Sequence, residues 1–279
     1  MNEKGRFEKD RLKIGVFDSG FGGLTVLRAL IELLPDADSI YLGDTARLPY
    51  GSKSRETISR YAVSSARFIE EQGADLLVVA CNTATALALD DIQAALPIPV
   101  IGVIGPGAEA ARGVSAGGSV LVLATAATVS SSAYTKALHA VGLASYEKAC
   151  PLLVPLVEEG WTEHPVTDEV IRIYLREALD AAPGTKTLLL GCTHYPLIEP
   201  AIRRVLAGLG HPLEIVDSAR ATAAATRRLI DEEFPEAGPS NSEPRRWFYA
   251  TDSVEKFKRL GTSFLGQPLD EVRLVDLGG

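Results

Sequence analysis

The sequence predicts an α/β protein made of two similar domains with mostly parallel sheets. Short apolar runs alternate with segments of helical periodicity, which is the pattern of parallel strands joined by helices. A cysteine follows an apolar strand twice, in LLVVACNTATAL at 76–87 and in LLLGCTHYPL at 188–197. The chain of 279 residues also has about the length of two domains.

The first elements expected are a strand, a glycine-rich loop and a helix. The apolar run at 12–17 ends at Asp18, and the loop DSGFGG separates it from a helix over 24–34. A strand at 40–42 precedes the loop LPYGSKS, after which Ser54 is a suitable N-cap for a helix. The strand before Cys81 then leads into a helix that Pro97 ends.

The same alternation continues after a strand at 100–104, where Pro106 and Gly107 indicate a break at which a second domain begins. CPLLVPLVEEGW at 150–161 reads as irregular or short helical, and EAGPSNSEP at 236–244 reads as a surface loop. The further strands are expected at 120–124, 187–190, 215–217, 247–249 and 272–277. The further helices are expected from the serines at 130–132 through Leu138, at 170–179 and 198–209, through Arg227 and Ile230, and at 254–265.

The overall charge and the cysteine content exclude several classes of protein. The 28 basic and 36 acidic residues give a net charge of −8, and no long basic run suits nucleic acid. The leader MNEKGRFEKD has no apolar core, and no segment is long enough to span a bilayer. Three widely spaced cysteines indicate free thiols in a reducing compartment. We therefore expect a soluble cytoplasmic protein without a nucleic-acid or membrane partner.

Cys81 and Cys192 are the candidate reactive groups. A single cysteine after an apolar strand is most often an inert small hydrophobe, but two in matched settings favour chemistry. Each is expected at a helix N-terminus, where the partial positive charge favours a thiolate that can act as base or nucleophile. Cys150, before Pro151, lacks such a setting and is interpreted as structural.

Two other kinds of site fit the residues poorly. DSGFGG lacks the third glycine of a dinucleotide loop and the Lys-Ser/Thr pair of a phosphate loop, and Asp18 would repel pyrophosphate. Cys192 and His194 form only a two-ligand cluster, and the other histidines lie in unrelated settings. We expect no metal.

Five motifs together resemble the cofactor-independent aspartate/glutamate racemase family, and its glutamate-specific members in particular. They are FDSGFGGLTVL at 17–27, DTARLPYGSKS at 44–54, ACNTATA at 80–86, VPLVEEG at 154–160 and GCTHYPLI at 191–198. Each is weak alone, but their order over almost the whole chain is specific. The resemblance implies interconversion of L- and D-glutamate without a cofactor, which supplies D-glutamate for peptidoglycan.

The resemblance also implies a domain arrangement. The first domain would comprise residues 11–105 and 219–279, because the C-terminal segment returns to it, and the second would comprise residues 106–218. The active site would lie in the cleft between them. We also expect a homodimer, for which the sequence carries no decisive pattern.

The roles of individual residues follow from the same resemblance. Cys81 and Cys192 are implied to be the acid/base pair, one on each face of the substrate, since inversion needs a second group to return the proton. The matched assisting residues are Asp18, His194 and Glu158, with Glu159 close enough to Glu158 to confuse the assignment. The implied substrate-binding residues are Asp18, Ser19, Tyr50, Gly51, Asn82, Thr83, Thr125, Thr193 and His194.

Simpler interpretations stay open. Asp18 could only cap its loop, His194 could be hydrogen-bonded structure, and Asn82 and Thr83 could only cap a helix. An aspartate racemase is the main rival enzyme, but that branch usually carries an acidic residue at the position of His194. A two-lobed amino-acid-binding protein is the rival of another class, and the thiol pair and the absence of an export signal disfavour it.

Overall fold

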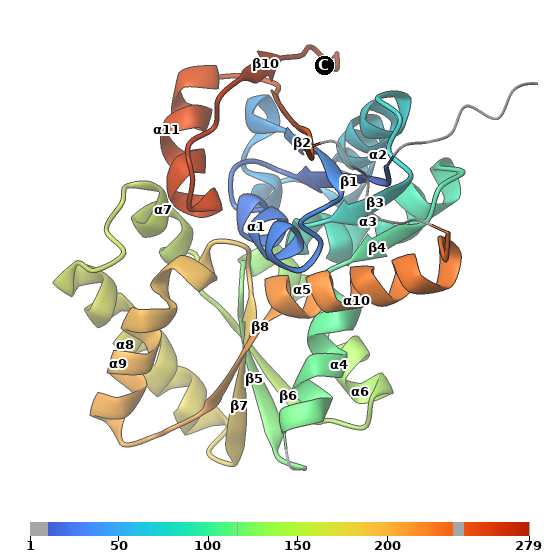
Figure 1. Cartoon of the computed structure of the whole chain (residues 1–279). Helices are drawn as coiled ribbons and strands as arrows, with labels where there is room; N and C mark the ends of the chain where they lie inside the picture. The colour runs from blue at the N-terminus through green and yellow to red at the C-terminus, as the bar shows by residue number, and fades with distance from the viewer. Residues whose placement is uncertain (1–10, 116, 237–242, 279) are drawn as a thin grey trace, which may run out of the picture.

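Two parallel sheets form the framework of the protein (Figure 1). The computed structural model describes residues 11–115, 117–236 and 243–278. The strands of the first sheet are β1 (Lys13–Asp18), β2 (Asp38–Gly43), β3 (Leu76–Val79), β4 (Val100–Gly102), β9 (Arg246–Ala250) and β10 (Val272–Leu274). Those of the second sheet are β5 (Ser119–Ala124), β6 (Ser145–Ala149), β7 (Thr185–Gly191) and β8 (Glu214–Asp217). The predicted α/β class with mostly parallel sheets is confirmed.

The two sheets repeat one topology. The first has the order β10-β9-β2-β1-β3-β4 and the second β6-β5-β7-β8, so four consecutive strands follow the same path in each. In the first sheet β2 lies on one side of β1 and β3 on the other, and in the second sheet β6 and β7 flank β5 in the same way. The chain therefore changes direction across each sheet between β1 and β3 and between β5 and β7. Ligand sites of open α/β sheets lie outside the carboxyl ends of the strands at such a point. Cys81 follows β3 and Cys192 follows β7, so each cysteine leaves its sheet at this position.

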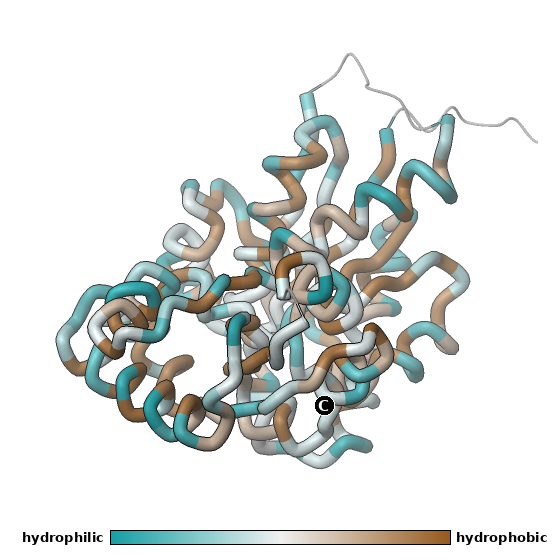
Figure 2. The backbone as a smooth tube through the Cα atoms, turned by 90° about the horizontal axis from the view of Figure 1, so that it is seen from below, coloured by the Kyte–Doolittle hydropathy of each residue, from teal (hydrophilic) through white to brown (hydrophobic). Residues whose placement is uncertain are grey.

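Helices cover the faces of both sheets. They are α1 (Leu24–Leu33), α2 (Arg55–Glu71), α3 (Asn82–Ala95), α4 (Ile104–Val114), α5 (Ala126–Ser131), α6 (Ala133–Ala140), α7 (Leu153–Glu158), α8 (Pro165–Ala181), α9 (Glu199–Leu209), α10 (Ser218–Glu233) and α11 (Val254–Leu265). Short 3-10 turns lie at Thr45–Arg47, Tyr50–Ser52 and Tyr195–Ile198. Along the outer helices in Figure 2, hydrophilic teal alternates with hydrophobic brown, as expected for helices that bury one face.

The apolar core connects the two sheets. On β1, Ile14 and Val16 belong to one buried cluster, whereas Phe17 belongs to a second cluster on the opposite face. The first cluster includes residues of α1 and α11 and continues into the second sheet. Helix α10 packs against both α1 and α4 and lies between the sheets in Figure 1. Burial of shared apolar surface therefore holds the two sheets together.

Some predicted elements were wrong or incomplete. Pro106 lies in the first turn of α4 and Gly107 follows it within the helix, so the break expected at these residues is absent. A helix tolerates proline in its first turn because the backbone N–H groups there have no helical partner. The strand expected at 100–104 accordingly ends at Gly102. The serines expected to cap a helix end α5, and Ser132 joins α5 to α6 with a φ of 54°.

Strand β6 had no counterpart in the prediction. Its sequence SYEKA is half-buried along its whole length and contains two charged residues, so it shows no alternation of apolar and polar residues. Most of the predicted loop at 236–244 and the charged leader at 1–10 lie outside the described residues. Within the described part of the chain, no helix is both long and apolar enough to cross a membrane.

Candidate active site

A cavity of about 530 Å³ lies where the carboxyl ends of the two sheets meet. Loops that follow β1, β3, β5 and β7 all contribute to its wall. The lining residues are Ser19, Leu48, Pro49, Tyr50, Gly51, Cys81, Asn82, Thr83, Thr125, Ala126, Cys150, Pro151, Val154, Pro155, Glu158, Glu159, Cys192, Thr193, His194 and Lys256. Of the site residues expected from the sequence, only Asp18 is not part of this lining. The volume suits a small-molecule ligand.

Cys81 is the N-cap of α3. Its sulfur accepts a hydrogen bond from the N–H of Ala84 at 3.4 Å and donates to Oγ of Ser19 at 3.4 Å. Burial, reinforced by the nearby carboxylate of Asp18, raises the pKa of Cys81 to about 12. The expected position of Cys81 at a helix N-terminus is confirmed, but burial outweighs the effect of the helix dipole on its pKa.

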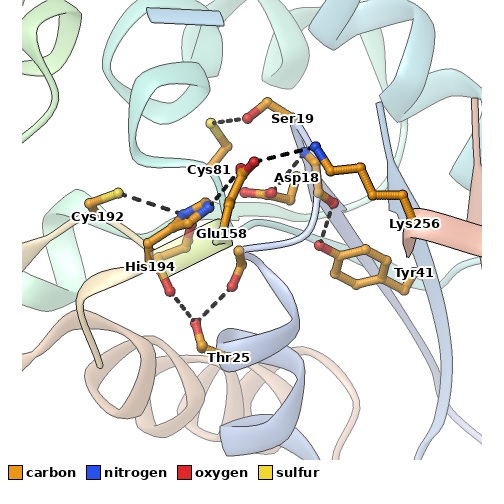
Figure 3. A network of polar contacts seen from close by, with 12 residues as sticks. Asp18, Ser19, Thr25, Tyr41, Cys81, Glu158, Cys192, His194 and Lys256 are labelled. Carbon is orange, nitrogen blue, oxygen red and sulfur yellow. Dashed lines mark hydrogen bonds and ion pairs between the residues drawn. The ribbon is translucent and has the colours of Figure 1, made fainter. Parts of the chain in front are cut away.

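Cys192 has a different environment. A 3-10 turn at Tyr195–Ile198 separates it from α9, so the expected position at a helix N-terminus is wrong for this cysteine. The positively charged partner is instead His194, whose Nδ1 lies 3.9 Å from the Cys192 sulfur. Nε2 of the same imidazole lies 3.2 Å from Oε1 of Glu158. Figure 3 shows these three side chains in series.

The His194–Glu158 pair is an ion pair at neutral pH. Burial alone would lower the pKa of His194, but its interactions with Cys192 and Glu158 outweigh burial and raise that pKa to about 10. Burial alone would raise the pKa of Glu158, but its interactions with His194 and Lys256 hold that pKa below its usual value. An imidazolium so placed can give a proton to the Cys192 sulfur or hold negative charge on it.

Asp18 lies behind the cavity wall at the end of β1. Its Oδ2 accepts the N–H of Gly20 at 2.8 Å, as the simpler loop-capping interpretation requires. Its Oδ1 is buried without a hydrogen-bond partner among the described residues. Burial raises the pKa of Asp18, and its charge in turn contributes to the raised pKa of Cys81. Asp18 and Cys81 are therefore electrostatically coupled.

Several amide and hydroxyl groups also line the cavity. The Asn82 side-chain oxygen accepts a hydrogen bond of 2.6 Å from Tyr134, whereas its Nδ2 is buried without a partner in the described structure. The hydroxyls of Thr83 and Thr125 lie 3.1 Å apart. Tyr50 donates its hydroxyl to Asp44 at 2.6 Å, so it has no hydroxyl hydrogen left to donate to a ligand. These groups offer neutral hydrogen bonds suited to carboxylates.

The glycine loop brings the two sheets into close approach. A Cβ atom at Gly22 would overlap Oγ1 of Thr193 and lie 2.6 Å from Nδ1 of His194. Nearby, the hydroxyl of Thr25 donates to the backbone oxygen of Thr193 at 2.9 Å. The absence of a side chain at Gly22 therefore permits the position of the loop that carries Cys192, Thr193 and His194.

Sequence reasoning missed several cavity residues. Lys256 on α11 reaches Glu158, with Nζ 3.6 Å from Oε2, and no motif marked this lysine. Cys150, interpreted as structural, is buried in the lining, where its sulfur donates to the backbone oxygen of Lys148 at 3.5 Å. The remaining unexpected residues are apolar: Leu48, Pro49, Ala126, Pro151, Val154 and Pro155. Glu159, the neighbour that left the assignment of Glu158 open, also lines the cavity. Among the described residues, no group of three or more His, Cys, Asp or Glu could hold a metal ion.

Comparison with known proteins identifies the class of enzyme. Residues 14–226 match the family model described as Asp/Glu/Hydantoin racemase. A curated relative, the glutamate racemase of Koribacter versatilis, is 51% identical over 97% of this chain and 99% of its own length. The chain belongs to the Asp/Glu/Hydantoin racemase family and is an amino-acid racemase.

Solved structures point to one branch of that family. Glutamate racemase from Francisella tularensis in complex with D-glutamate has a TM-score of 0.87 at 35% identity, covering 96% of this chain and 98% of that one. Glutamate racemase from Thermus thermophilus in complex with β-chloro-D-alanine has a TM-score of 0.85 at 43% identity, with the same coverage of 96% and 98%. The fold and nearly the whole chain are shared with these glutamate racemases.

Proposed function

We propose that this enzyme interconverts L- and D-glutamate by proton transfer at the α-carbon, with Cys81 and Cys192 as its two bases. The observation that carries the proposal is that both thiols line one cavity, each after the equivalent strand of its own sheet. Two bases from two sheets can approach a substrate between them from opposite sides. The similarity to glutamate racemases supports glutamate as the substrate.

The chemical step is symmetric. The sulfur that starts as a thiolate removes the α-proton and leaves a carbanion, and the thiol on the other face then returns its own proton. The configuration is inverted, and the thiolate and thiol have exchanged places. The pair therefore carries one transferable proton. Each enantiomer uses the same two residues in opposite roles.

Each thiol has its own assisting groups in this proposal. Asp18 and Ser19 assist Cys81, because Ser19 contacts its sulfur and Asp18 acts on its charge. His194 and Glu158 assist Cys192 through the series of contacts in Figure 3. The imidazolium of His194 can stabilise a thiolate at Cys192, whereas the charge of Asp18 raises the pKa of Cys81 and so makes its thiolate a stronger base once it forms.

The remaining predicted residues bind the substrate. We assign the carboxylates of glutamate to hydroxyl, amide and backbone N–H donors. The unpartnered Nδ2 of Asn82 supports this assignment, because a buried amide without a partner is costly unless a ligand satisfies it. We assign the substrate ammonium to Asp18, whose buried Oδ1 has no hydrogen-bond partner among the described residues and would have to become accessible from the cavity. The residues assigned to binding are Asp18, Ser19, Tyr50, Gly51, Asn82, Thr83, Thr125, Thr193 and His194.

We extend the proposal to the organisation of the protein and its place in the cell. Residues 11–105 and 219–279 form one domain and residues 106–218 the other; the pairing of β9 and β10 with the first sheet supports this division. Relative movement of the domains admits substrate and then excludes water. The enzyme works in the cytoplasm as a homodimer and supplies D-glutamate for peptidoglycan. Sedimentation of the purified chain tests the dimer.

Racemisation in heavy water tests the proposed mechanism. Starting from L-glutamate, the first D-glutamate formed should carry α-deuterium, while the remaining L-glutamate keeps its hydrogen, because each face has its own base. Aspartate in the same assay should exchange far more slowly. A binding protein would leave the α-hydrogen of both amino acids untouched.

Cysteine variants complete the test. Cys81→Ser and Cys192→Ser should each lower turnover by about 10²- to 10⁴-fold, the usual contribution of an acid/base group. Circular dichroism should show the fold retained in both. Near-normal racemisation by either variant would refute the assignment of two bases.

A further inference from the structure

We propose that Lys256 is a positioning residue for one half of the reaction: it holds Glu158 so that this carboxylate faces His194 beside Cys192. The inference depends on the proposed function, since it takes Cys192 as one of the two bases. It assigns Lys256 an effect on proton transfer at Cys192 and none of its own on transfer at Cys81.

The two oxygens of Glu158 have different partners. Oε1 lies 3.2 Å from Nε2 of His194, and Oε2 lies 3.6 Å from Nζ of Lys256. The carboxylate is thus held between two cations, as Figure 3 shows. Glu158 is the last residue of α7, a six-residue helix, and its side chain is only 21% exposed. Without the lysine, rotation of the carboxylate away from His194 would meet less resistance.

Lys256 has a second contact besides its ion pair with Glu158. Its Nζ lies 5.3 Å from the ring centroid of Phe21, which belongs to the glycine loop after β1. Phe21 packs against Phe257, the residue next to Lys256, with ring centroids 5.6 Å apart. The Lys256 side chain is 46% exposed, and the cation–π contact and the aromatic packing favour the position in which its ammonium group faces the cavity.

Helix α11, which carries Lys256, also contacts the imidazole of His194. Phe264 of α11 packs edge-on against His194, with ring centroids 5.0 Å apart. Helix α11 therefore touches both members of the His194–Glu158 pair, through Phe264 at one end and Lys256 at the other. The helix lies far from α7 in sequence, but the Lys256–Glu158 ion pair brings the two helices together, and α7 lies below α11 in Figure 1.

The charges around His194 explain why the effect should be one-sided. His194 faces Cys192 on its own loop and Glu158 on α7, and it senses the charge of Asp18 at the end of β1. Lys256 makes its ion pair with Glu158, whereas the Cys81 sulfur contacts Ser19 and the N–H of Ala84. Loss of the lysine should therefore slow the step at Cys192 selectively.

Substrate isotope effects can separate the two halves. We would compare Lys256→Met with Lys256→Arg, and with Lys258→Met as a control on the same helix outside the cavity lining. Lys256→Met should lower kcat by roughly 10- to 100-fold, the cost of a misplaced catalytic group. In the direction in which Cys192 removes the substrate proton, the slowed step is proton removal, so the α-deuterium isotope effect on kcat should rise. In the other direction Cys192 returns a solvent proton, so proton removal limits the rate less and this isotope effect should fall. Lys256→Arg should restore the wild-type pattern, and Lys258→Met should keep it.

A double variant tests whether Lys256 acts through Glu158. In the Glu158→Gln background, Lys256→Met should cause no further loss of kcat, because the group that it positions is gone. Equal isotope effects in both directions for Lys256→Met, or a full additional loss in the Glu158→Gln background, would overturn the inference. If the wild-type enzyme fails to racemise glutamate, or Cys192→Ser stays active, the proposed function fails as well.

Discussion

The hydroxyl of Tyr134 donates a hydrogen bond of 2.6 Å to the side-chain oxygen of Asn82. Tyr134 lies on α6, beside the second sheet, and Asn82 opens α3, which follows the first sheet. Both side chains are buried. The bond engages the amide oxygen and leaves Nδ2 as the free donor of this side chain. A residue beside one sheet thus orients a cavity residue that directly follows Cys81 at the end of the other sheet.

Tyr134→Phe should weaken both stability and substrate binding. The variant leaves the buried oxygen of Asn82 without a partner, which costs about 1–3 kcal/mol of unfolding free energy. The amide is then free to rotate, so KM for glutamate should rise more than kcat falls. Urea unfolding and steady-state kinetics measure the two effects. Tyr146→Phe, on β6 and outside the cavity lining, is the control. Unchanged stability and KM in Tyr134→Phe would show that the hydrogen bond does not orient Asn82.

Gly22→Ala should reduce activity through the position of His194. The new methyl group would lie 2.6 Å from Nδ1 of His194, so the loop that carries this residue and Cys192 must move. We expect kcat to fall by about 100-fold, since displacement of about 1 Å has that effect on a catalytic group. Gly113→Ala, in α4, has no atom within 4 Å of the added Cβ and should keep full activity. Equal activity of the two variants would contradict the close-approach role of Gly22.

Asp18→Asn should make Cys81 ionise at lower pH. Burial is the main cause of the raised pKa of Cys81, about 12, and the negative charge of Asp18 is the next. The substitution removes the charge and leaves the burial, so the pKa should fall part of the way toward its ordinary value. Iodoacetamide labelling followed by mass spectrometry reports the pH dependence at Cys81. Cys150 in the same sample is the internal control, because burial and not Asp18 raises its pKa. An unshifted labelling curve for Cys81 would contradict the electrostatic role of Asp18.

The contribution of His194 to stability should fall in alkaline solution. The pKa of His194 is raised to about 10 in the folded protein, against about 6.5 in an unfolded chain. Its protonated form is therefore stabilised by folding, fully below about pH 6.5 and progressively less as pH rises through 10. The difference in unfolding free energy between wild type and His194→Gln should shrink over this range. A difference that stays constant or grows would show that the imidazolium is not the stabilised form.

The sequence predicted most of the fold because most elements bury one strongly apolar face. Helix α11 was predicted with both bounds correct, since Phe257, Leu260 and Phe264 recur at helical spacing and are all buried. Strand β6 was missed because an edge strand, half-buried on both faces, needs no alternation of apolar and polar residues. Helix α4 was missed because Pro106 ends a helix in most positions and is tolerated only in the first turn.

The site was predictable only where chemistry is encoded in local motifs. Asn82, Thr83, Thr193 and His194 belong to the two cysteine motifs and were predicted from the resemblance of these motifs to the racemase family, and all four line the same cavity. Lys256 was not found, because its contact with Glu158 arises from the packing of α11 near α7, which no local pattern records.

The difference between the two thiol environments was also hidden from the sequence. Both cysteines follow an apolar strand and precede small polar residues, which predicts a helix N-terminus for each. The 3-10 turn after Cys192 gives it a histidine partner in place of a helix N-terminus. Burial cannot be read from one strand end alone, so the raised pKa of Cys81 was not expected either.

The central claim is that two sulfur atoms act on opposite faces of one α-carbon. A crystal structure of this enzyme with bound D-glutamate tests it most directly. The account predicts the α-carbon between the sulfurs of Cys81 and Cys192, each about 3–3.5 Å from it along opposite directions, as reacting atoms require. A substrate that contacts only one of these sulfurs, or has both on the same face, would contradict the two-base mechanism.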